Sequence, residues 1–441
     1  MKVAVIDNGI SRGLLRCPVE YYVIHEGKVV EEDSGVTEFS HGSRCARLVV
    51  RGISDVEVVS LRIHPEFADG TERDLLAALL WCVNHPVDLI NMSNGIASFF
   101  HNEAINDVCY QLWKRGTLLV AAVSNTWEYT VPANLPYVRS VSTLPLFSWK
   151  KKNPFTQADR KCRGLALLRK RNGGVFLSGG NSFSCARESN RLLKKMRRGF
   201  VCKQSVSSHL TDFAMLKQVV IWGREALIPG MPVCMKEVEM KTEGIEVDTT
   251  LVIADCKSGR RTLNQLKRIQ ETVDLLIWCD RKIPIGIKRW CEVHKTSFWK
   301  EPRWVGRSFH DTACLSQLKD VFVIAIHGEE LPLREALQLK RAFSEQGYHT
   351  LLFSNTSRSY LYGAFPFTDS RRILQICKAV HPSVILIDPG EDICLNCDLR
   401  IDFDSGGVWM ESEKGKERLG HSPTGITYPR IVKMIEDMND E

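Results

Sequence analysis

The chain has 441 residues, of which 44% are hydrophobic and 25% charged, and its formal net charge is +7 at pH 7. This length suits two domains of ordinary size rather than one. The composition is that of a globular protein and excludes a disordered or fibrous one. No apolar run approaches the ~20 residues that a membrane-spanning helix requires, so we expect no membrane partner.

The chain opens with an apolar run that leads directly into Asp7, without a charged and apolar leader. We therefore expect a cytoplasmic protein that is complete at its N-terminus. Its fifteen cysteines are scattered and set in apolar runs, as is typical of reduced core thiols. Cys394 and Cys397 have half of a zinc-site spacing, but no second pair follows them. We expect neither a metal nor a cofactor.

The first half of the chain alternates short apolar runs with amphipathic helical patterns. The expected strands are 2–6, 56–63, 88–92 and 118–123, and the expected helices are 72–84 and 104–115. All-apolar strands separated by amphipathic helices predict an α/β fold, a parallel sheet with helices on both faces. Active sites collect at the carboxyl ends of such strands.

The second half repeats this alternation after a less regular stretch. A helix is expected over 184–197, and later strands are expected at 250–254, 275–278, 321–326, 350–353 and 384–387, with helices at 262–271, 333–346 and 370–380. This pattern predicts a first domain over 1–205, a joining region over 206–245, a Rossmann-like α/β domain over 246–410, and a polar tail over 411–441.

The positive charge is concentrated in one stretch. From Lys150 to Lys203, sixteen Lys and Arg residues face only Asp159 and Glu188, a net charge of +14. Such a stretch is either a solvated surface or a site that attracts an anionic partner. No nucleic-acid-binding motif or interleaved aromatic pattern accompanies it. We therefore favour an acidic peptide over nucleic acid.

Three short motifs occur in one order: Asp7-Asn8-Gly9 after an apolar strand, then His41-Gly42-Ser43, then Gly180-Asn181-Ser182. Each alone is typical of an ordinary turn or helix cap. Together they supply the groups that activate a serine hydroxyl. The histidine takes the hydroxyl proton, and the aspartate orients the imidazole and stabilises its charge.

Six motifs in order, within residues 1 to about 200, resemble the subtilisin-like serine peptidases, the subtilases. They are the three motifs above together with Asn91–Gly95, 119–125 and 131–138. The resemblance implies a catalytic triad of Asp7, His41 and Ser182. It also implies that the Asn125 side chain and the Ser182 backbone N–H bind the oxyanion, and that substrate is bound by Ser93, Asn94, Gly95 and Ser124.

The chain departs from the family pattern at four positions near these motifs. Asn8 stands where the family usually has Thr or Ser, Asn181 where it has Thr, Ser124 where it has Gly, and Arg187 where its helix normally carries Pro nearby. None of these changes removes a group that transfers a proton. We expect them to affect substrate preference or to lower activity.

Residues 246–410 resemble an accessory protein of clostridial peptide-maturation systems. The matching segments are the strand 321–328 with the helix after it, Gln346-Gly347-Tyr348, 362–366 and 382–387. The resemblance implies a domain that holds a ribosomally made precursor peptide or recruits peptide-maturation enzymes. We therefore expect a serine endopeptidase that cleaves the leader of a natural-product precursor, and we favour an acidic leader. The alternative is a catalytically idle subtilase-fold scaffold that binds the precursor or a maturation partner.

Overall fold

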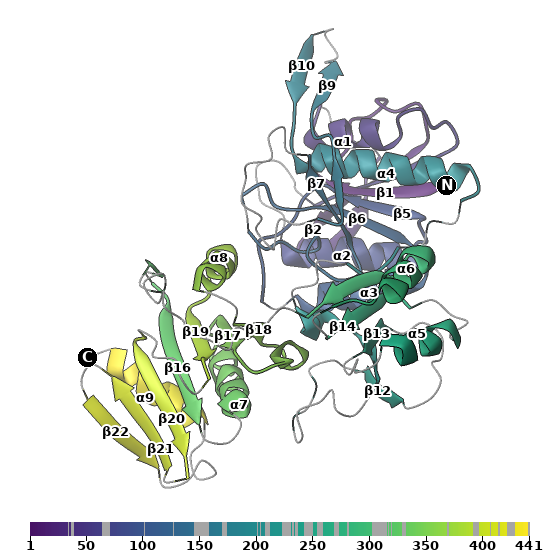
Figure 1. Ribbon diagram of the computed structural model, residues 1–441. Coiled ribbons are helices and arrows are strands. Elements are labelled where there is room, and N and C mark those ends of the chain that lie inside the picture. The colour runs from purple at the N-terminus through teal and green to yellow at the C-terminus, as the bar shows by residue number, and fades with distance from the viewer. Residues whose placement is uncertain are drawn as a thin grey trace. The chain divides into compact units, whose positions relative to one another are not determined.

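A computed structural model describes most of the 441 residues (Figure 1). It leaves out 34, 37–38, 64–70, 101, 127, 145–157, 170–173, 201, 203, 208–211, 223–230, 232, 234–236, 242–249, 254–258, 269–272, 280–281, 302–314, 316, 319, 329–331, 368–369, 391–396, 406, 413–414, 421–427 and 440–441. The chain divides into two compact units. The N-terminal unit comprises Met1–Thr211 with Lys295–Ser297, and the C-terminal unit comprises Asp212–His294 with Phe298–Glu441.

The N-terminal unit is built on an eight-stranded sheet in the order β3-β2-β4-β1-β5-β6-β7-β8. Its strands are β1 (Lys2–Asp7), β2 (Val19–His25), β3 (Lys28–Glu31), β4 (Glu57–Arg62), β5 (Leu89–Met92), β6 (Leu118–Ala122), β7 (Arg139–Thr143) and β8 (Arg160–Cys162). All neighbours are parallel except β2 and β3, which form a hairpin at one edge. The central strand β1 is buried because Val3–Ile6 are apolar on both faces of the sheet.

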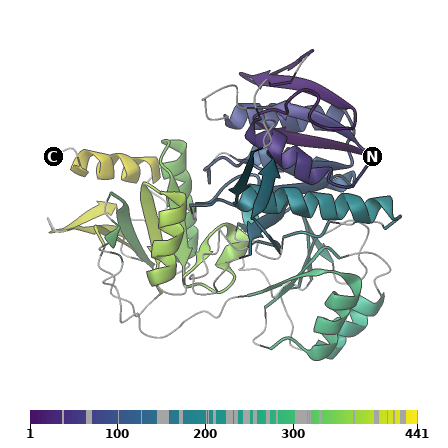
Figure 2. The ribbon, with the colours of Figure 1, turned by 90° about the horizontal axis from the view of Figure 1, so that it is seen from above.

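Helices cover both faces of this sheet. Helices α1 (His41–Val49) and α4 (Asn181–Arg197) pack together on one face, and α2 (Glu72–Asn84) and α3 (Glu103–Lys114) lie on the other (Figure 1). Figure 2 shows α4 extended along the unit. A two-stranded hairpin, β9 (Ala166–Arg169) and β10 (Val175–Ser178), leads into α4. The predicted parallel α/β class is confirmed, while β2, β3 and β7–β10 had no counterpart in the sequence analysis.

The C-terminal unit contains two sheets rather than the single Rossmann-like sheet that the sequence suggested. A five-stranded sheet has the order β12-β11-β13-β14-β15, and a seven-stranded sheet has the order β18-β17-β19-β16-β20-β21-β22. The first comprises β11 (Gln218–Trp222), β12 (Glu237–Lys241), β13 (Thr250–Ile253), β14 (Leu275–Trp278) and β15 (Ser297–Lys300), with helices α5 (Gly259–Arg268) and α6 (Ile285–His294).

The seven-stranded sheet comprises β16 (Phe322–Gly328), β17 (Thr350–Ser354), β18 (Phe365–Pro366), β19 (Val384–Asp388), β20 (Leu399–Asp404), β21 (Gly407–Ser412) and β22 (Gly415–Gly420). Its helices are α7 (Pro332–Glu345), α8 (Ser370–Val380) and α9 (Tyr428–Asn439). Strands β16–β20 are parallel to one another, and β21 and β22 continue the sheet from β20 as an antiparallel meander.

Two segments of the C-terminal half are more ordered than the sequence indicated. The expected joining region supplies β11 and β12, because the apolar run in Gln218–Trp222 pairs with β13. The expected polar tail supplies β22 and α9. In α9, Ile431, Val432 and Ile435 are buried, a spacing that places them on one face of a helix. Among the described residues, no helix combines the length and apolar character needed to cross a lipid bilayer.

A buried carboxylate ties α4 to the edge of the N-terminal sheet. The Glu188 side chain is fully buried and accepts hydrogen bonds from Arg139 at 3.0 Å and from Arg191 Nε at 2.7 Å, with Arg160 at 3.7 Å. Burial alone would raise the pKa of Glu188. Its hydrogen bond from Arg191 and the charges of Arg191 and Arg139 nevertheless lower that pKa below the ordinary value.

We expect Glu188→Gln to lower the free energy of unfolding by about 1–3 kcal/mol at pH 7, since charge-assisted hydrogen bonds to a buried group are lost. Because the folded-state pKa of Glu188 is lowered, its contribution is present above the unfolded-state pKa and is lost as the pH falls through the folded-state value. The difference between the wild type and the variant should therefore shrink below about pH 4.5. Urea unfolding of both proteins at pH 7 and pH 3 measures this difference in the free energy of unfolding.

The matched control is Glu20→Gln. Glu20 forms an ion pair with Lys2 in the same unit, but its side chain is 43% exposed. Solvent screens such a pair, so the variant should be nearly as stable as the wild type. Equal effects of the two substitutions at pH 7 would show that the buried carboxylate does not hold α4.

Candidate active site

The six predicted motifs converge at the carboxyl edge of the N-terminal sheet. Asp7 is the last residue of the central strand β1, Ser93 follows β5, and Asn125 follows β6. His41 is the first residue of α1, and Ser182 is the second residue of α4. The parallel arrangement of β1, β5 and β6 brings these chain segments, far apart in sequence, to one end of the sheet.

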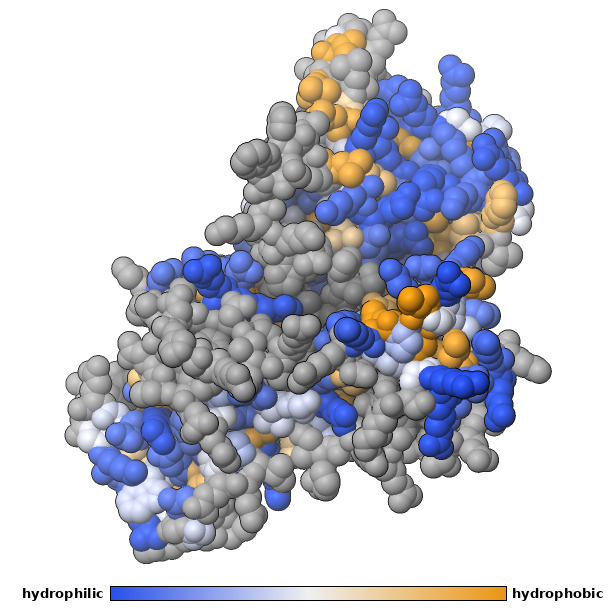
Figure 3. All heavy atoms as spheres, viewed as in Figure 1, coloured by the Kyte–Doolittle hydropathy of each residue, from blue (hydrophilic) through white to orange (hydrophobic). Residues whose placement is uncertain are grey.

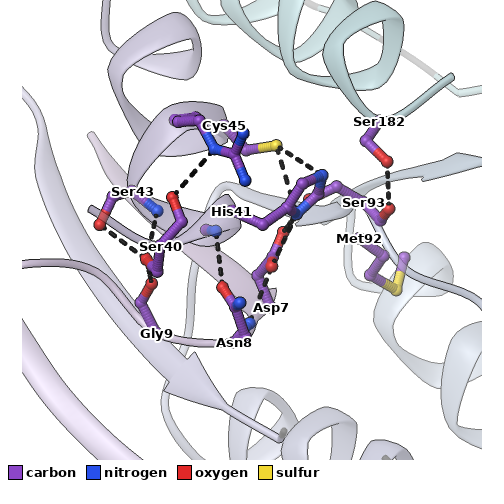
Figure 4. Close-up of polar contacts among 12 residues, drawn as sticks. Asp7, Asn8, Gly9, Ser40, His41, Ser43, Cys45, Met92, Ser93 and Ser182 are labelled. Atoms are coloured by element: carbon purple, nitrogen blue, oxygen red, sulfur yellow. Dashed lines mark hydrogen bonds and ion pairs between the residues drawn. The ribbon is translucent and has the colours of Figure 1, made fainter. Parts of the chain in front are cut away.

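Asp7 and His41 form a direct pair (Figure 4). Nδ1 of His41 lies 3.0 Å from both carboxylate oxygens of Asp7. The Asp7 side chain is 4% exposed, whereas that of His41 is 32% exposed. Asp7 also accepts hydrogen bonds from the Asn8 backbone N–H at 2.8 Å and from the Ser93 hydroxyl. The carboxylate is thus buried and held from three sides, with the imidazole on its open side.

The turn after β1 is fastened to the start of α1. Ser40 caps α1 by accepting from Ser43 N–H at 3.0 Å and donates to the Gly9 carbonyl at 2.5 Å. Asn8 accepts from Gly42 N–H at 2.8 Å. A Cβ on Gly42 would lie 2.6 Å from the Gly9 carbonyl oxygen, so only glycine permits this approach. These contacts fix the position of His41 relative to Asp7.

Each member of the pair shifts the pKa of the other. Burial alone would raise the pKa of Asp7, but the charge of His41 and the hydrogen bonds from His41, Ser93 and Asn8 lower it. Burial alone would lower the pKa of His41, but the charge and hydrogen bond of Asp7 raise it. Asp7 therefore stays ionised and stabilises the imidazolium, the form of His41 that exists after it has taken a proton.

Ser182 lies opposite Ser93 rather than in contact with His41. Its hydroxyl donates to the Ser93 carbonyl oxygen at 2.7 Å (Figure 4). In the described part of the chain, no hydrogen bond joins Ser182 to His41. Ser93 thus contacts two members of the predicted triad, Asp7 through its side chain and Ser182 through its backbone. Catalytic hydrogen bonds often form only when substrate is bound, so this resting geometry is compatible with catalysis.

Asn181 and Asn125 join the start of α4 to β6 and β7. The Asn181 side chain donates to the carbonyls of Val123 and Ser124 at 2.9 and 3.0 Å and accepts from Thr143 N–H at 2.8 Å. The Asn125 side-chain oxygen accepts from Asn181 N–H at 3.3 Å. This contact uses the oxygen of the amide. Asn181, where the chain departs from the family pattern, therefore holds the start of α4 against the ends of β6 and β7. The sequence did not reveal this role.

The remaining predicted substrate-binding residues follow β5 and β6. Ser93 is buried, Asn94 and Gly95 continue the chain, and Ile96 forms an isolated antiparallel bridge with Val131. Ser124 places its carbonyl against Asn181, while its hydroxyl lies 2.9 Å from Thr126. The structure thus groups Ser93–Gly95 near Ser182, and Ser124 at the start of α4.

The described part of the basic stretch is spread over β8, β9 and α4 rather than gathered at Ser182. At ~1.5 Å per helical residue, Lys194 and Arg198 lie about 18 and 24 Å along the axis from Ser182. Residues 150–157 and 170–173 lie outside the described residues. The exposed Arg163 lies nearer to Ser182. Its neighbour Gly164 packs against the chain just before Ser182, because a Cβ added to Gly164 would lie 2.9 Å from the Gly180 carbonyl oxygen.

The hairpin before the nucleophile exposes apolar side chains. Leu165, Val175 and Leu177 are 45%, 59% and 63% exposed. Figure 3 shows hydrophobic atoms on this hairpin at the top of the view. The chain passes from β10 through Gly179 and Gly180 into Ser182. An apolar surface therefore lies directly before Ser182 in the chain.

Comparison with known proteins gives a family for this unit. The sequence model of the subtilase family, a peptidase family, matches residues 1–190. Residues 1–190 belong to the subtilase family. The N-terminal unit is therefore a subtilisin-like serine peptidase domain, and the resemblance seen in the sequence is confirmed. Among curated proteins, no relative matches.

Solved structures resemble the chain over about half its length. The prenylagaramide maturation protease PagA is 19% identical, covering 45% of this chain and 77% of its own, with a TM-score of 0.35. A lanthipeptide protease is 17% identical, covering 46% and 76%, with a TM-score of 0.37. The self-cleaved protease domain of PatA is 22% identical, covering 45% and 82%, with a TM-score of 0.34. These TM-scores all lie below 0.5.

Sequence reasoning missed three residues of the subtilase site. Ser40 carries the usual signal of a helix cap before His41. The Ser93 side chain binds Asp7 although only its substrate-binding role was expected. Cys45, one turn after His41, places its sulfur 3.9 Å from both ring nitrogens. Its position four residues after His41 in a helix was the available signal. Of the Cys394 and Cys397 pair, Cys394 lies outside the described residues.

Proposed function

We propose that the subtilase domain hydrolyses a peptide bond through an acyl-enzyme formed on Ser182. His41 acts as general base, Asp7 orients the imidazole, and the Asn125 amide binds the oxyanion together with the Ser182 backbone N–H. The observation that carries the proposal is the buried Asp7 bound to Nδ1 of His41 at 3.0 Å, because a carboxylate at Nδ1 leaves Nε2 as the ring nitrogen that would accept the proton of Ser182.

The proposed mechanism requires one side-chain movement. Ser182 must leave the Ser93 carbonyl and donate its hydroxyl proton to His41. Substrate backbone that pairs with Ser93–Gly95 would compete for that carbonyl and so favour the movement. The oxyanion that forms would be met by the amide nitrogen of Asn125, since the Asn125 oxygen already accepts from Asn181. Water would then hydrolyse the acyl-enzyme, with His41 again as the base.

A fluorophosphonate probe tests this proposal directly, because it labels only an activated serine. We expect one label per chain, at Ser182, with no label on Ser182→Ala or His41→Ala. A wild-type chain that folds but takes up no label would favour the alternative, an idle scaffold that binds a peptide.

For the substrate, we propose a dedicated peptide, the leader of a ribosomally made natural-product precursor. Two features support a selective site: the apolar hairpin before Ser182 and the exposed Arg163 beside it. The link to precursor maturation rests on the resemblance of residues 246–410 to an accessory protein. In this proposal the C-terminal unit holds the precursor or a maturation enzyme.

Arg163 provides a test of the preference for an acidic peptide. We expect Arg163→Glu to lower kcat/KM for an acidic peptide several-fold at low ionic strength, with the loss shrinking as salt screens the charge. A neutral peptide with the same cleavage site should change little. The measurement is kcat/KM for both peptides at two salt concentrations.

Arg198→Glu is the matched control, because Arg198 is exposed but about 24 Å along α4 from Ser182. That distance is about three Debye lengths at physiological ionic strength. Its effect should therefore be small at that salt concentration. If both variants respond alike to salt and to peptide charge, the basic stretch is only a solvated surface.

A further inference from the structure

The buried thiol of Cys45 lies against the Asp7 and His41 pair (Figure 4). Its sulfur is 3.9 Å from both Nδ1 and Nε2 of His41. Asp7, His41 and Cys45 each offer one ligand atom, and these three atoms lie within 4.8 Å of one another. The proposed mechanism gives the thiol no task. A carboxylate, an imidazole and a thiol at such distances are ligands that zinc prefers.

We propose that Asp7, His41 and Cys45 form an inhibitory zinc site inside the catalytic centre. The ion would bind Nδ1 of His41, a carboxylate oxygen of Asp7 and the sulfur of Cys45, with water in the fourth position. Binding releases the thiol proton to solvent, and the single proton of the neutral imidazole moves from Nδ1 to Nε2. The binding itself depends only on the geometry, whereas the inhibition rests on the proposed function.

The distances require only a small adjustment. Tetrahedral zinc at 2.0–2.2 Å from nitrogen and oxygen and about 2.3 Å from sulfur separates N and S by about 3.5 Å and N and O by about 3.3 Å. The structure has 3.9 Å between Sγ and Nδ1 and 3.0 Å between Nδ1 and the carboxylate oxygens. Binding would bring the sulfur about 0.4 Å closer to Nδ1 and move the carboxylate oxygen about 0.3 Å away from it. The sulfur and that oxygen, which lie within 4.8 Å of each other, would also have to meet at the ion.

Charge and access also favour this occupant. A carboxylate and a thiolate together neutralise a divalent ion, so the occupied site carries no net buried charge. The His41 side chain is 32% exposed, which gives an ion a path past the imidazole to the buried Asp7 and Cys45. Magnesium and calcium prefer all-oxygen sites with six or more ligands and should not bind here.

Zinc at Nδ1 would remove the general base. A neutral imidazole carries one proton, and with Nδ1 bound to metal that proton sits on Nε2. The ring then has no lone pair with which to accept the proton of Ser182. Zinc would also occupy the carboxylate that orients His41. The triad would be switched off without any change in the backbone.

The first experiment measures metal binding without catalysis. In the Ser182→Ala chain, cobalt(II) serves as a spectroscopic substitute for zinc. We expect a thiolate-to-cobalt charge-transfer band at one equivalent, which zinc abolishes by competition. Adding Cys45→Ala should remove the band. Adding Cys82→Ala, which deletes another buried thiol of the same unit, should leave it unchanged. A band that survives Cys45→Ala, or no band at all, overturns the proposal.

The second experiment measures inhibition in the chain that retains Ser182. Zinc should suppress fluorophosphonate labelling, a chelator should restore it, and magnesium should have no effect. For Cys45→Ala we compare labelling with and without zinc in the same variant, so that its basal labelling rate does not matter. We expect zinc to suppress labelling of this variant at least about tenfold less than labelling of the wild type. An equal response to zinc in both proteins contradicts the proposal. Failure of the proposed triad would instead abolish labelling without zinc while leaving the cobalt band intact.

Discussion

Ser182→Ala should abolish peptide hydrolysis, with a fall in kcat on the order of 10⁶, the loss measured when the serine of a subtilisin triad is removed. The substitution deletes the nucleophilic hydroxyl and one hydrogen bond to the Ser93 carbonyl.

His41→Ala should be comparably damaging, because the hydroxyl then has no base. Asp7→Asn should cost about 10⁴, since the imidazole is held in the wrong tautomer. Release of a fluorescent group from a quenched peptide measures each rate.

The fold should survive the loss of one hydroxyl. Circular dichroism and the thermal midpoint of Ser182→Ala should match those of the wild type. Ser54→Ala is the matched control, because the Ser54 hydroxyl is exposed and contacts its neighbour Asp55. It should retain full activity. Undiminished turnover by a folded Ser182→Ala protein would refute the assignment of the nucleophile.

Asn125→Ala should lower kcat by about 10²–10³ with little change in KM. Loss of one oxyanion donor has this effect in subtilisin, because the donor binds the oxyanion more strongly than the ground-state carbonyl. Asn125→Asp is a sharper variant. It keeps an oxygen to accept from Asn181 N–H and replaces only the donor. It should therefore be at least as damaging as Asn125→Ala. Steady-state kinetics with one peptide separates kcat from KM.

Asn190→Ala controls for the loss of an asparagine that supports α4. Its side chain donates to the Val49 and Arg51 carbonyls, away from Ser182. We expect a lower thermal midpoint but a kcat near that of the wild type. If the whole loss in Asn125→Ala falls on KM, Asn125 positions substrate and does not bind the oxyanion.

The fold of the N-terminal unit could be predicted because its signals are local. The run Val3–Ile6 is buried on both faces, and 72–84 matches α2 residue for residue. Edge elements could not be predicted in the same way. The strands β8 and β10 are short and lack strict alternation, and only their pairing partners stabilise them.

The C-terminal half shows the same limit at a larger scale. The sequence indicated most of its helices, and α8 has the expected bounds of 370–380. It did not indicate that β11–β15 and β16–β22 form separate sheets. Strand pairing joins residues distant in sequence, so propensity alone cannot decide which strands share a sheet.

By itself, the sequence determined the α/β class, the subtilase family of the first 190 residues and the identity of the residues that we propose as the triad. Motif order carries that information because each motif supplies its own turn and side chain. Only the tertiary structure decided that Ser93 touches both Asp7 and Ser182, that Asn181 anchors α4, and that Cys45 lies beside His41. These contacts depend on how strands and helices pack, and packing distances are not encoded in any single segment.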